Sequence, residues 1–200
     1  MQNKAPHNQE PTALHGAAAD NLRYIRAAME SATAFTGVSG KGYVLGGLTA
    51  AVAAWIASRQ PSATLWLAVW LLEATLAAGI MLFLTAGKAR VQGKSLWIGS
   101  GRKLLFAFLP TFVAGAVVTL ALHLQGYTLL LPGLWLVLYG AGVMTAGAHS
   151  IRLIPLMGML FMVAGTVQLS GFGPMNLTLA LAFGGLHVIF GILIWRHHGG

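Results

Sequence analysis

Glu73 is the residue whose chemistry most needs an explanation, because it is a carboxylate inside an almost continuous run of hydrocarbon. The run spans residues 64–86 and reads TLWLAVWLLEATLAAGIMLFLTA, and Glu73 is the only acidic residue after Glu30. An ionised carboxylate near the middle of a bilayer costs about 3 kcal/mol on insertion scales. Glu73 must therefore be paired with another group, face water, or bind a proton.

Two tryptophans share a helical face with Glu73, since Trp66 and Trp70 precede it by seven and three residues. A carboxylate beside two indole rings suits an organic cation, through charge attraction and cation–π contact. In its chemistry this arrangement resembles the small multidrug-resistance exporters, which exchange a cation for protons at one membrane-embedded Glu. Those exporters are shorter, four-span chains, and no stretch here aligns with them. Alternatively, the tryptophans belong to an outer aromatic belt and Glu73 is protonated or bonded to another helix.

His187 is the expected partner of Glu73. It lies within the last apolar segment at a depth close to that of Glu73, so the two side chains can touch if their helices are neighbours. A membrane-embedded Glu–His pair can relay protons, or it can be a polar lock between helices, and the lock is favoured. His123 and His149 lie near segment ends, which argues against two histidines holding a haem at one depth.

No catalytic residue, metal site or cofactor is predicted from the motifs. The chain has no cysteine, and it contains no HExxH, no GxSxG and no carboxylate cluster with metal-ligand spacing. These absences favour a protein that is not an enzyme.

The elements that position Glu73 are predicted to be membrane-spanning helices. Of the 200 residues, 56% are hydrophobic and only 8% are charged, whereas a soluble domain has about 25% charged residues. We therefore expect an all-α, polytopic integral membrane protein with a six-helix transmembrane bundle. The expected spans are about 43–58, 64–86, 104–124, 128–148, 153–169 and 175–195 within a domain covering residues 43–196.

The first 42 residues are predicted to lie outside the bilayer. Residues 1–19 are expected to be a disordered tail, and residues 20–42 an amphipathic helix and hinge, with Asp20 as the N-cap and a helix end near Phe35. This basic helix is expected either to lie on the lipid headgroups or to pack against the cytoplasmic side of its own bundle, with partner binding as a third alternative.

Small residues recur at every fourth position of the first expected span, a pattern that favours close helix packing. Their partner is expected to be another helix of the same chain, with a second copy or another membrane protein as the alternative. The ridge comprises Gly42, Gly46, Ala50, Ala54 and Ser58.

Basic residues between the apolar segments are interpreted as anchors to anionic lipid headgroups rather than as a nucleic-acid surface, although the net charge is +8. Six spans place 11 of the 12 Lys and Arg side chains on the side of the two termini, which the positive-inside rule assigns to the cytoplasm. The anchors expected in the longest loop, residues 87–103, are Lys88, Arg90, Lys94, Arg102 and Lys103.

Three stretches resemble a family of small bacterial multi-pass membrane proteins of unknown function: residues 21–42, the GRK at 101–103, and LLPGLWLVLYG at 130–140. The resemblance implies a bacterial inner-membrane location and no particular activity. The leading interpretation is a non-enzymatic accessory or sensory component that acts through helix packing and its cytoplasmic face. The alternative is a proton-coupled transporter that uses Glu73 and carries a small solute, with a cation as one candidate. A weaker alternative is an intramembrane enzyme acting on lipid.

Overall fold

The computed structural model describes residues 16, 18–25, 28–29 and 35–199, and the chain divides into two units, Met1–Thr33 and Ala34–Gly200. In the first unit the described residues are helical, and Asp20 forms an ion pair with Arg23. Asp20 therefore lies inside a helical stretch rather than at its N-cap. Phe35, the expected end of this helix, is not helical and forms an isolated bridge with Ser150. Most of the expected tail, residues 1–19, lies outside the described residues.

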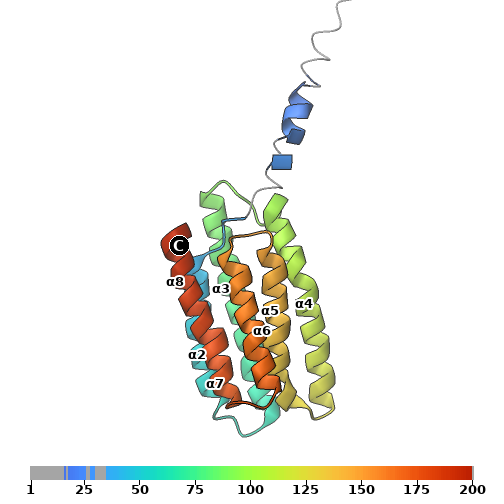
Figure 1. Ribbon diagram of the computed structural model, residues 1–200, viewed down its shortest axis with the longest axis vertical. Coiled ribbons are helices and arrows are strands. Elements are labelled where there is room, and N and C mark those ends of the chain that lie inside the picture. Colours follow the sequence, from blue (N-terminus) through green and yellow to red (C-terminus); the bar gives the residue numbers. More distant parts are fainter. Residues whose placement is uncertain (1–15, 17, 26–27, 30–34, 200) are drawn as a thin grey trace, which may run out of the picture. The chain divides into compact units, whose positions relative to one another are not determined.

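Every regular element of the described part of the second unit is a helix (Figure 1). The chain order is α2 (Gly40–Ala57), α3 (Ala63–Val91), α4 (Gly99–Leu124), the 3-10 turn η1 (Thr128–Leu130), α5 (Leu131–Gly147), α6 (Leu153–Leu169), α7 (Met175–Leu179), the π-helix η2 (Ala180–Leu186) and α8 (His187–His198).

Among the described residues, four helical segments are long and apolar enough to cross a membrane, which is the composition of an all-α membrane protein. They are Ala63–Val91, Gly99–Leu124, Thr128–Gly147 and Met175–His198, and α6 is a shorter apolar helix.

The helix ends differ from the ends of the apolar runs. Helix α3 continues past Ala86 to Val91, and α4 begins at Gly99 rather than Leu104. The loop between them is therefore shorter than the expected 87–103. Backbone hydrogen bonds do not require apolar side chains, and basic side chains in the last turn of α3 interact favourably with the helix dipole. At the N-terminal ends of α2 and α3, the side chains of Ser39 and Ser62 cap the helices by accepting hydrogen bonds from backbone N–H groups.

The helices of the described part of the second unit form two groups. The first helix group comprises α2, α3 and the continuous α7–η2–α8 segment, with α2 packed against both α3 and α8; the second helix group comprises α4, α5 and α6, with α5 packed against both neighbours.

Glycines allow the backbones of α5 and α6 to approach closely in the second helix group. Gly133, Gly140 and Gly147 recur every seventh residue on α5 and face Gly165, Gly158 and Pro155 of α6. A Cβ added at Gly140 would lie 2.6 Å from the Gly158 carbonyl oxygen, and one added at Gly158 would lie 2.6 Å from the Gly140 oxygen. Only glycine permits this approach.

Helix α2 uses two faces of small residues. The face that meets η2 and α8 contains Gly47, where an added Cβ would lie 2.7 Å from the Gly184 carbonyl oxygen. Gly42 and Gly46 of the predicted ridge face α3, with Met81 Sδ 3.2 Å and Ala77 Cβ 3.7 Å from their added Cβ positions. Ala50 and Ala54 are also buried, whereas Ser58 is exposed and its hydroxyl donates to the Trp55 carbonyl.

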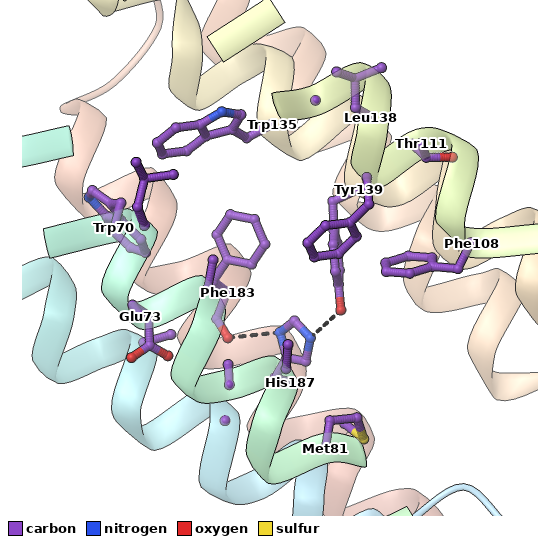
Figure 2. Close-up of a pocket in the computed structure, with 18 of the residues that line it drawn as sticks. Trp70, Glu73, Met81, Phe108, Thr111, Trp135, Leu138, Tyr139, Phe183 and His187 are labelled. Carbon is purple, nitrogen blue, oxygen red and sulfur yellow. Dashed lines mark hydrogen bonds between the residues drawn. The ribbon is translucent and has the colours of Figure 1, made fainter. Parts of the chain in front are cut away.

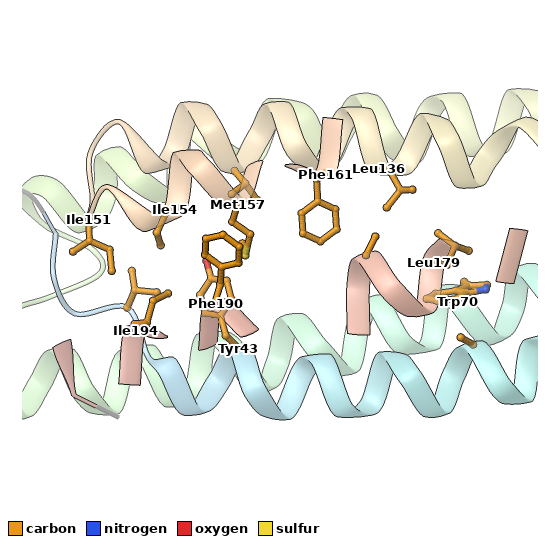
Figure 3. Packing of buried hydrophobic residues seen from close by; sticks show 14 of the residues in the cluster. Tyr43, Trp70, Leu136, Ile151, Ile154, Met157, Phe161, Leu179, Phe190 and Ile194 are labelled. Carbon is orange, nitrogen blue, oxygen red and sulfur yellow. The ribbon is translucent and has the colours of Figure 1, made fainter. Parts of the chain in front are cut away.

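The two helix groups meet through side chains rather than through backbone contacts. Figure 3 shows Ile154, Met157 and Phe161 of α6 and Phe190 and Ile194 of α8 packed in the buried hydrophobic cluster. A gap in this packing, between α3 and α4, positions the candidate site.

Candidate functional site

A cavity of about 300 Å³ lies where the two helix groups meet. Its walls come from α2, α3, α4, α5, η2 and the first residue of α8. In Figure 2, Trp70 and Glu73 of α3 lie on one side, Phe108 of α4 with Trp135 and Tyr139 of α5 on the other. Phe183 and His187 lie between these two walls. The cavity is therefore a mostly apolar space with several aromatic rings and few polar groups, which is typical of small-molecule sites.

Glu73 is buried in the cavity wall, with only 7% of its surface exposed. Its carboxylate oxygen Oε1 accepts a hydrogen bond of 2.8 Å from the hydroxyl of Thr49 on α2. That hydroxyl also lies 3.0 Å from the Gly46 carbonyl oxygen and 3.2 Å from the Leu45 carbonyl oxygen, so three acceptors share one proton. Within the described part of the chain, no basic side chain forms an ion pair with Glu73. The carboxylate thus lacks a compensating charge.

His187 uses both of its ring nitrogens in contacts other than Glu73. Nδ1 lies 2.8 Å from the carbonyl oxygen of Phe183, which can only accept, so Nδ1 carries a proton. In the neutral ring Nε2 then accepts from the hydroxyl of Tyr139 at 2.6 Å. Figure 2 shows both hydrogen bonds as dashed lines. His187 therefore links α8 to α5, and the expected hydrogen bond to Glu73 is not formed.

The physical reason is the lateral order of the helices. Because α2 packs between α3 and α8, Glu73 meets Thr49 of α2, although Glu73 and His187 line the same cavity. The local backbone also helps to position the His187 ring. The π-helix η2 ends immediately before His187 and contains Phe183, whose carbonyl oxygen accepts the hydrogen bond from Nδ1. Short π-helical segments often occur at functional sites.

The two predicted tryptophans have different environments. Trp70 lines the cavity, and its buried Nε1–H has no hydrogen-bond partner among the described residues. Trp66 lies behind the wall, where its ring stacks on Trp135 with centroids 5.5 Å apart. Its Nε1–H donates to Asn176 Oδ1 at 2.8 Å. Only Trp70 of this pair is placed to contact a ligand in the cavity.

Sequence reasoning missed Thr49 and Tyr139, the residues bonded to Glu73 and His187. A threonine in an apolar helix usually bonds its own backbone, so Thr49 carries little signal. Tyr139 did carry a signal, because a phenol in the middle of an apolar helix needs a hydrogen-bond partner. The site is thus a set of hydrogen-bonded polar pairs in a mostly apolar wall that contains several aromatic rings.

The predicted lipid anchors also divide into two kinds. Lys88 is buried, and its ammonium group donates to the carbonyl oxygens of Val38 at 2.8 Å and Gly199 at 2.6 Å. It ties the segment before α2 and the end of α8 to α3, instead of facing headgroups. Arg90, Lys94, Arg102 and Lys103 are exposed, with Lys94 donating to the Thr36 hydroxyl. Their contact with anionic lipid stays a prediction.

Within the described residues, no group of three or more His, Cys, Asp or Glu side chains is arranged to hold a metal ion. No protein-family model, no curated protein and no solved structure matches this chain. The functional argument therefore depends on the cavity and its residues.

Proposed function

We propose that this protein is a membrane-embedded transporter that binds a small organic cation in the cavity, at Glu73, in exchange for a proton. The observation that carries the proposal is a buried carboxylate in the wall of a cavity of about 300 Å³ with no basic partner among the described residues. Aromatic side chains around it supply the apolar and cation–π contacts that an organic cation requires.

The exchange follows from the cost of an unpaired charge. Glu73 lies about 15 Å along α3 from its first residue, which is near the middle of a hydrocarbon core about 30 Å thick. An ionised carboxylate at that depth costs about 3 kcal/mol or more unless a proton or a cation neutralises it. Because the two compete for one carboxylate, binding of the cation releases the proton. Tyr139 and His187 are the other titratable side chains that line the cavity.

The proposed architecture has six spans. Helix α6 follows α5 from the Gly133–Gly165 contact to the Gly147–Pro155 contact, and α2 follows η2 and α8 from Gly47 towards Gly40, which supports a similar membrane depth for the members of each pair. Six spans put both termini on one side, and the distribution of Lys and Arg favours the cytoplasm. The location proposed from the resemblance is the bacterial inner membrane. Reporter fusions at the two termini test this orientation, and reporters on opposite sides would contradict it.

The test compares two ligands of the same shape. Benzyltrimethylammonium carries a permanent positive charge, and neopentylbenzene is its neutral isostere. In lipid nanodiscs, we expect the cation to bind at least tenfold more tightly than the isostere and to release about one proton per site, read with a pH-sensitive dye. Glu73→Gln removes the charge and should abolish both the preference and the proton release. Thr75→Val is the control, because Thr75 is exposed on α3 and bonds only the Leu71 carbonyl.

Two results would contradict the proposal. One is equal binding of the cation and its isostere to the wild-type protein. The other is a Glu73→Gln variant that keeps the preference for the cation and changes only the melting temperature, which would make Glu73 a structural residue.

The accessory or sensory role remains a prediction with less support from this geometry. It rests on the lack of a catalytic motif in the sequence and on the small-residue ridge, and Gly42 and Gly46 of that ridge face α3 of the same chain. The lipid-acting enzyme remains the weaker alternative, and lipid turnover by the purified protein would be needed to favour it.

A further inference from the structure

The cavity has a mouth between α3 and α4. Four of its lining residues are exposed: Leu71 and Ala74 of α3, and Phe112 and Ala116 of α4. Leu71 and Phe112 keep 49% and 46% of their surface exposed, although both line the cavity. In the described bundle α3 and α4 do not form a packed pair. The wall is therefore incomplete on this side.

The mouth lies about a third to a half of the way along the two helices rather than at either end. At about 1.5 Å per residue, Leu71 and Ala74 are about 12 and 16 Å from the first residue of α3. Phe112 and Ala116 are about 18 and 12 Å from the last residue of α4. Both helices are long and apolar enough to span the membrane, with a hydrocarbon core about 30 Å thick around them. An opening at this depth faces lipid tails.

We propose that the cavity receives its ligand laterally from the bilayer, through the gap between α3 and α4. The ligand class is a lipophilic amine or ammonium ion, with an apolar body that dissolves in the membrane and one positively charged nitrogen. This inference rests on the proposed function for the charged group and adds the route and the lipophilicity.

The wall chemistry fits such a ligand. The aromatic rings of Phe108, Trp135 and Phe183 can cover an apolar body, and Glu73 can take the charge. His187 uses Nδ1 and Nε2 within the protein and offers no free nitrogen to an anionic ligand. The residues that line the cavity include no Lys or Arg. A lipid-soluble cation is therefore favoured over an anion or a sugar.

If the ligand enters laterally, its association rate depends on its concentration in the membrane. Each added methylene raises membrane partitioning about threefold to fourfold. In a series in which one methyl group of benzyltrimethylammonium is extended from methyl to butyl, we expect the association rate constant, expressed per aqueous concentration, to rise by about this factor at each step. Expressed per concentration in the membrane, it should stay nearly constant.

The mouth itself can be closed by substitution. Ala116→Trp places a large ring in the opening, and we expect the association rate of tritiated benzyldimethylbutylammonium in nanodiscs to fall at least tenfold. Val117→Trp is the matched control, because Val117 is 64% exposed on the same helix and does not line the cavity. The association rate of the Val117→Trp variant should stay within twofold of the wild-type rate. Should Ala116→Trp fail to fold, Ala74→Trp tests the same opening from α3.

The outcomes test the entry route and the binding site independently of each other. If Ala116→Trp or Ala74→Trp folds and binds at the wild-type rate while Glu73→Gln loses binding, the lateral route is overturned and the proposed function stands. An association rate constant that does not rise with chain length would also overturn the lateral route. If both the mouth variants and Glu73→Gln bind like wild type, the site itself is wrong.

Discussion

The α5–α6 contact and the cavity side of the bundle are built from opposite kinds of residue. Along α5–α6, Gly140 and Gly158 face each other so closely that neither position has room for a Cβ. Around the cavity, large rings such as Phe108, Trp135 and Tyr139 line an open space, and α3 and α4 leave a gap. In the α5–α6 contact the two helix backbones touch, whereas around the cavity side chains hold the helix backbones apart.

This difference indicates which helices can move relative to one another. In a bilayer the solvent is as apolar as the side chains, so helices are held by close packing and hydrogen bonds rather than by hydrophobic burial. The glycine contacts supply the close packing within each helix group. Between the groups, the Phe183 ring touches the rings of Tyr139 and Phe161, with centroids 5.2 Å apart in each pair. Rings can rotate where backbones cannot interpenetrate, so we expect ligand-dependent movement between the groups and little within them.

The largest effect is expected from breaking the α5–α6 contact. Gly140→Leu puts a side chain where an added Cβ already lies 2.6 Å from the Gly158 carbonyl oxygen. Forcing the helices apart should cost about 3 kcal/mol or more, at or above the upper end of usual overpacking effects. Thermal unfolding in detergent, with gel filtration to detect aggregation, measures the loss.

Gly79→Leu is the control for that experiment, because an added Cβ at Gly79 meets no atom within 4 Å. It should keep or raise the melting temperature, since replacing an open glycine inside a helix favours the helix by about 0.5–1 kcal/mol. Similar losses at Gly140 and Gly79 would mean that the two regions do not differ in the way described.

The sequence predicted the apolar segments well and the helix contacts only in part. Long apolar runs identify spans such as α3 because lipid must surround them. A single sequence does not tell which of two small-residue faces meets which neighbour. The every-fourth pattern of Gly42 and Gly46 was found, and it faces α3. The closer approach to α8 uses Gly40 and Gly47, seven residues apart, which the sequence analysis did not identify.

The candidate site shows the same limit. Residue counting along a helix predicts similar depths for Glu73 and His187, and in the structure both line one cavity. Counting gives no lateral order, so it could not show that α2 separates α3 from α8. That order decides that Glu73 bonds Thr49 and that His187 bonds Tyr139. The buried position of Lys88 depends likewise on a distant segment, the end of α8.

An intermediate effect is expected at the hydrogen bond that joins the two helix groups. Tyr139→Phe removes the hydroxyl that donates to His187 Nε2 and leaves a buried acceptor without a partner. The loss should be about 1–3 kcal/mol in unfolding free energy. Tyr127→Phe, at an exposed position, should change stability by less than about 0.5 kcal/mol.

A double-mutant cycle sharpens this result. Adding His187→Phe to Tyr139→Phe should cost less than His187→Phe costs alone, because the pair acts as one unit. Additive losses would show that the hydrogen bond does not couple the groups, and the joint between them would then consist of ring packing only.

The smallest effect compares two indoles in the same region. Trp66→Phe removes a donor that is bonded to Asn176, whereas Trp70→Phe removes a buried donor that has no partner among the described residues. Without ligand, Trp66→Phe should therefore be about 1 kcal/mol more destabilising than Trp70→Phe, since only Trp66→Phe leaves an acceptor unpaired. Melting curves of the two variants measure the difference. Equal losses would mean that Trp70 Nε1–H is satisfied in the ligand-free protein, and the cavity wall would then hold one polar group fewer for a ligand to use.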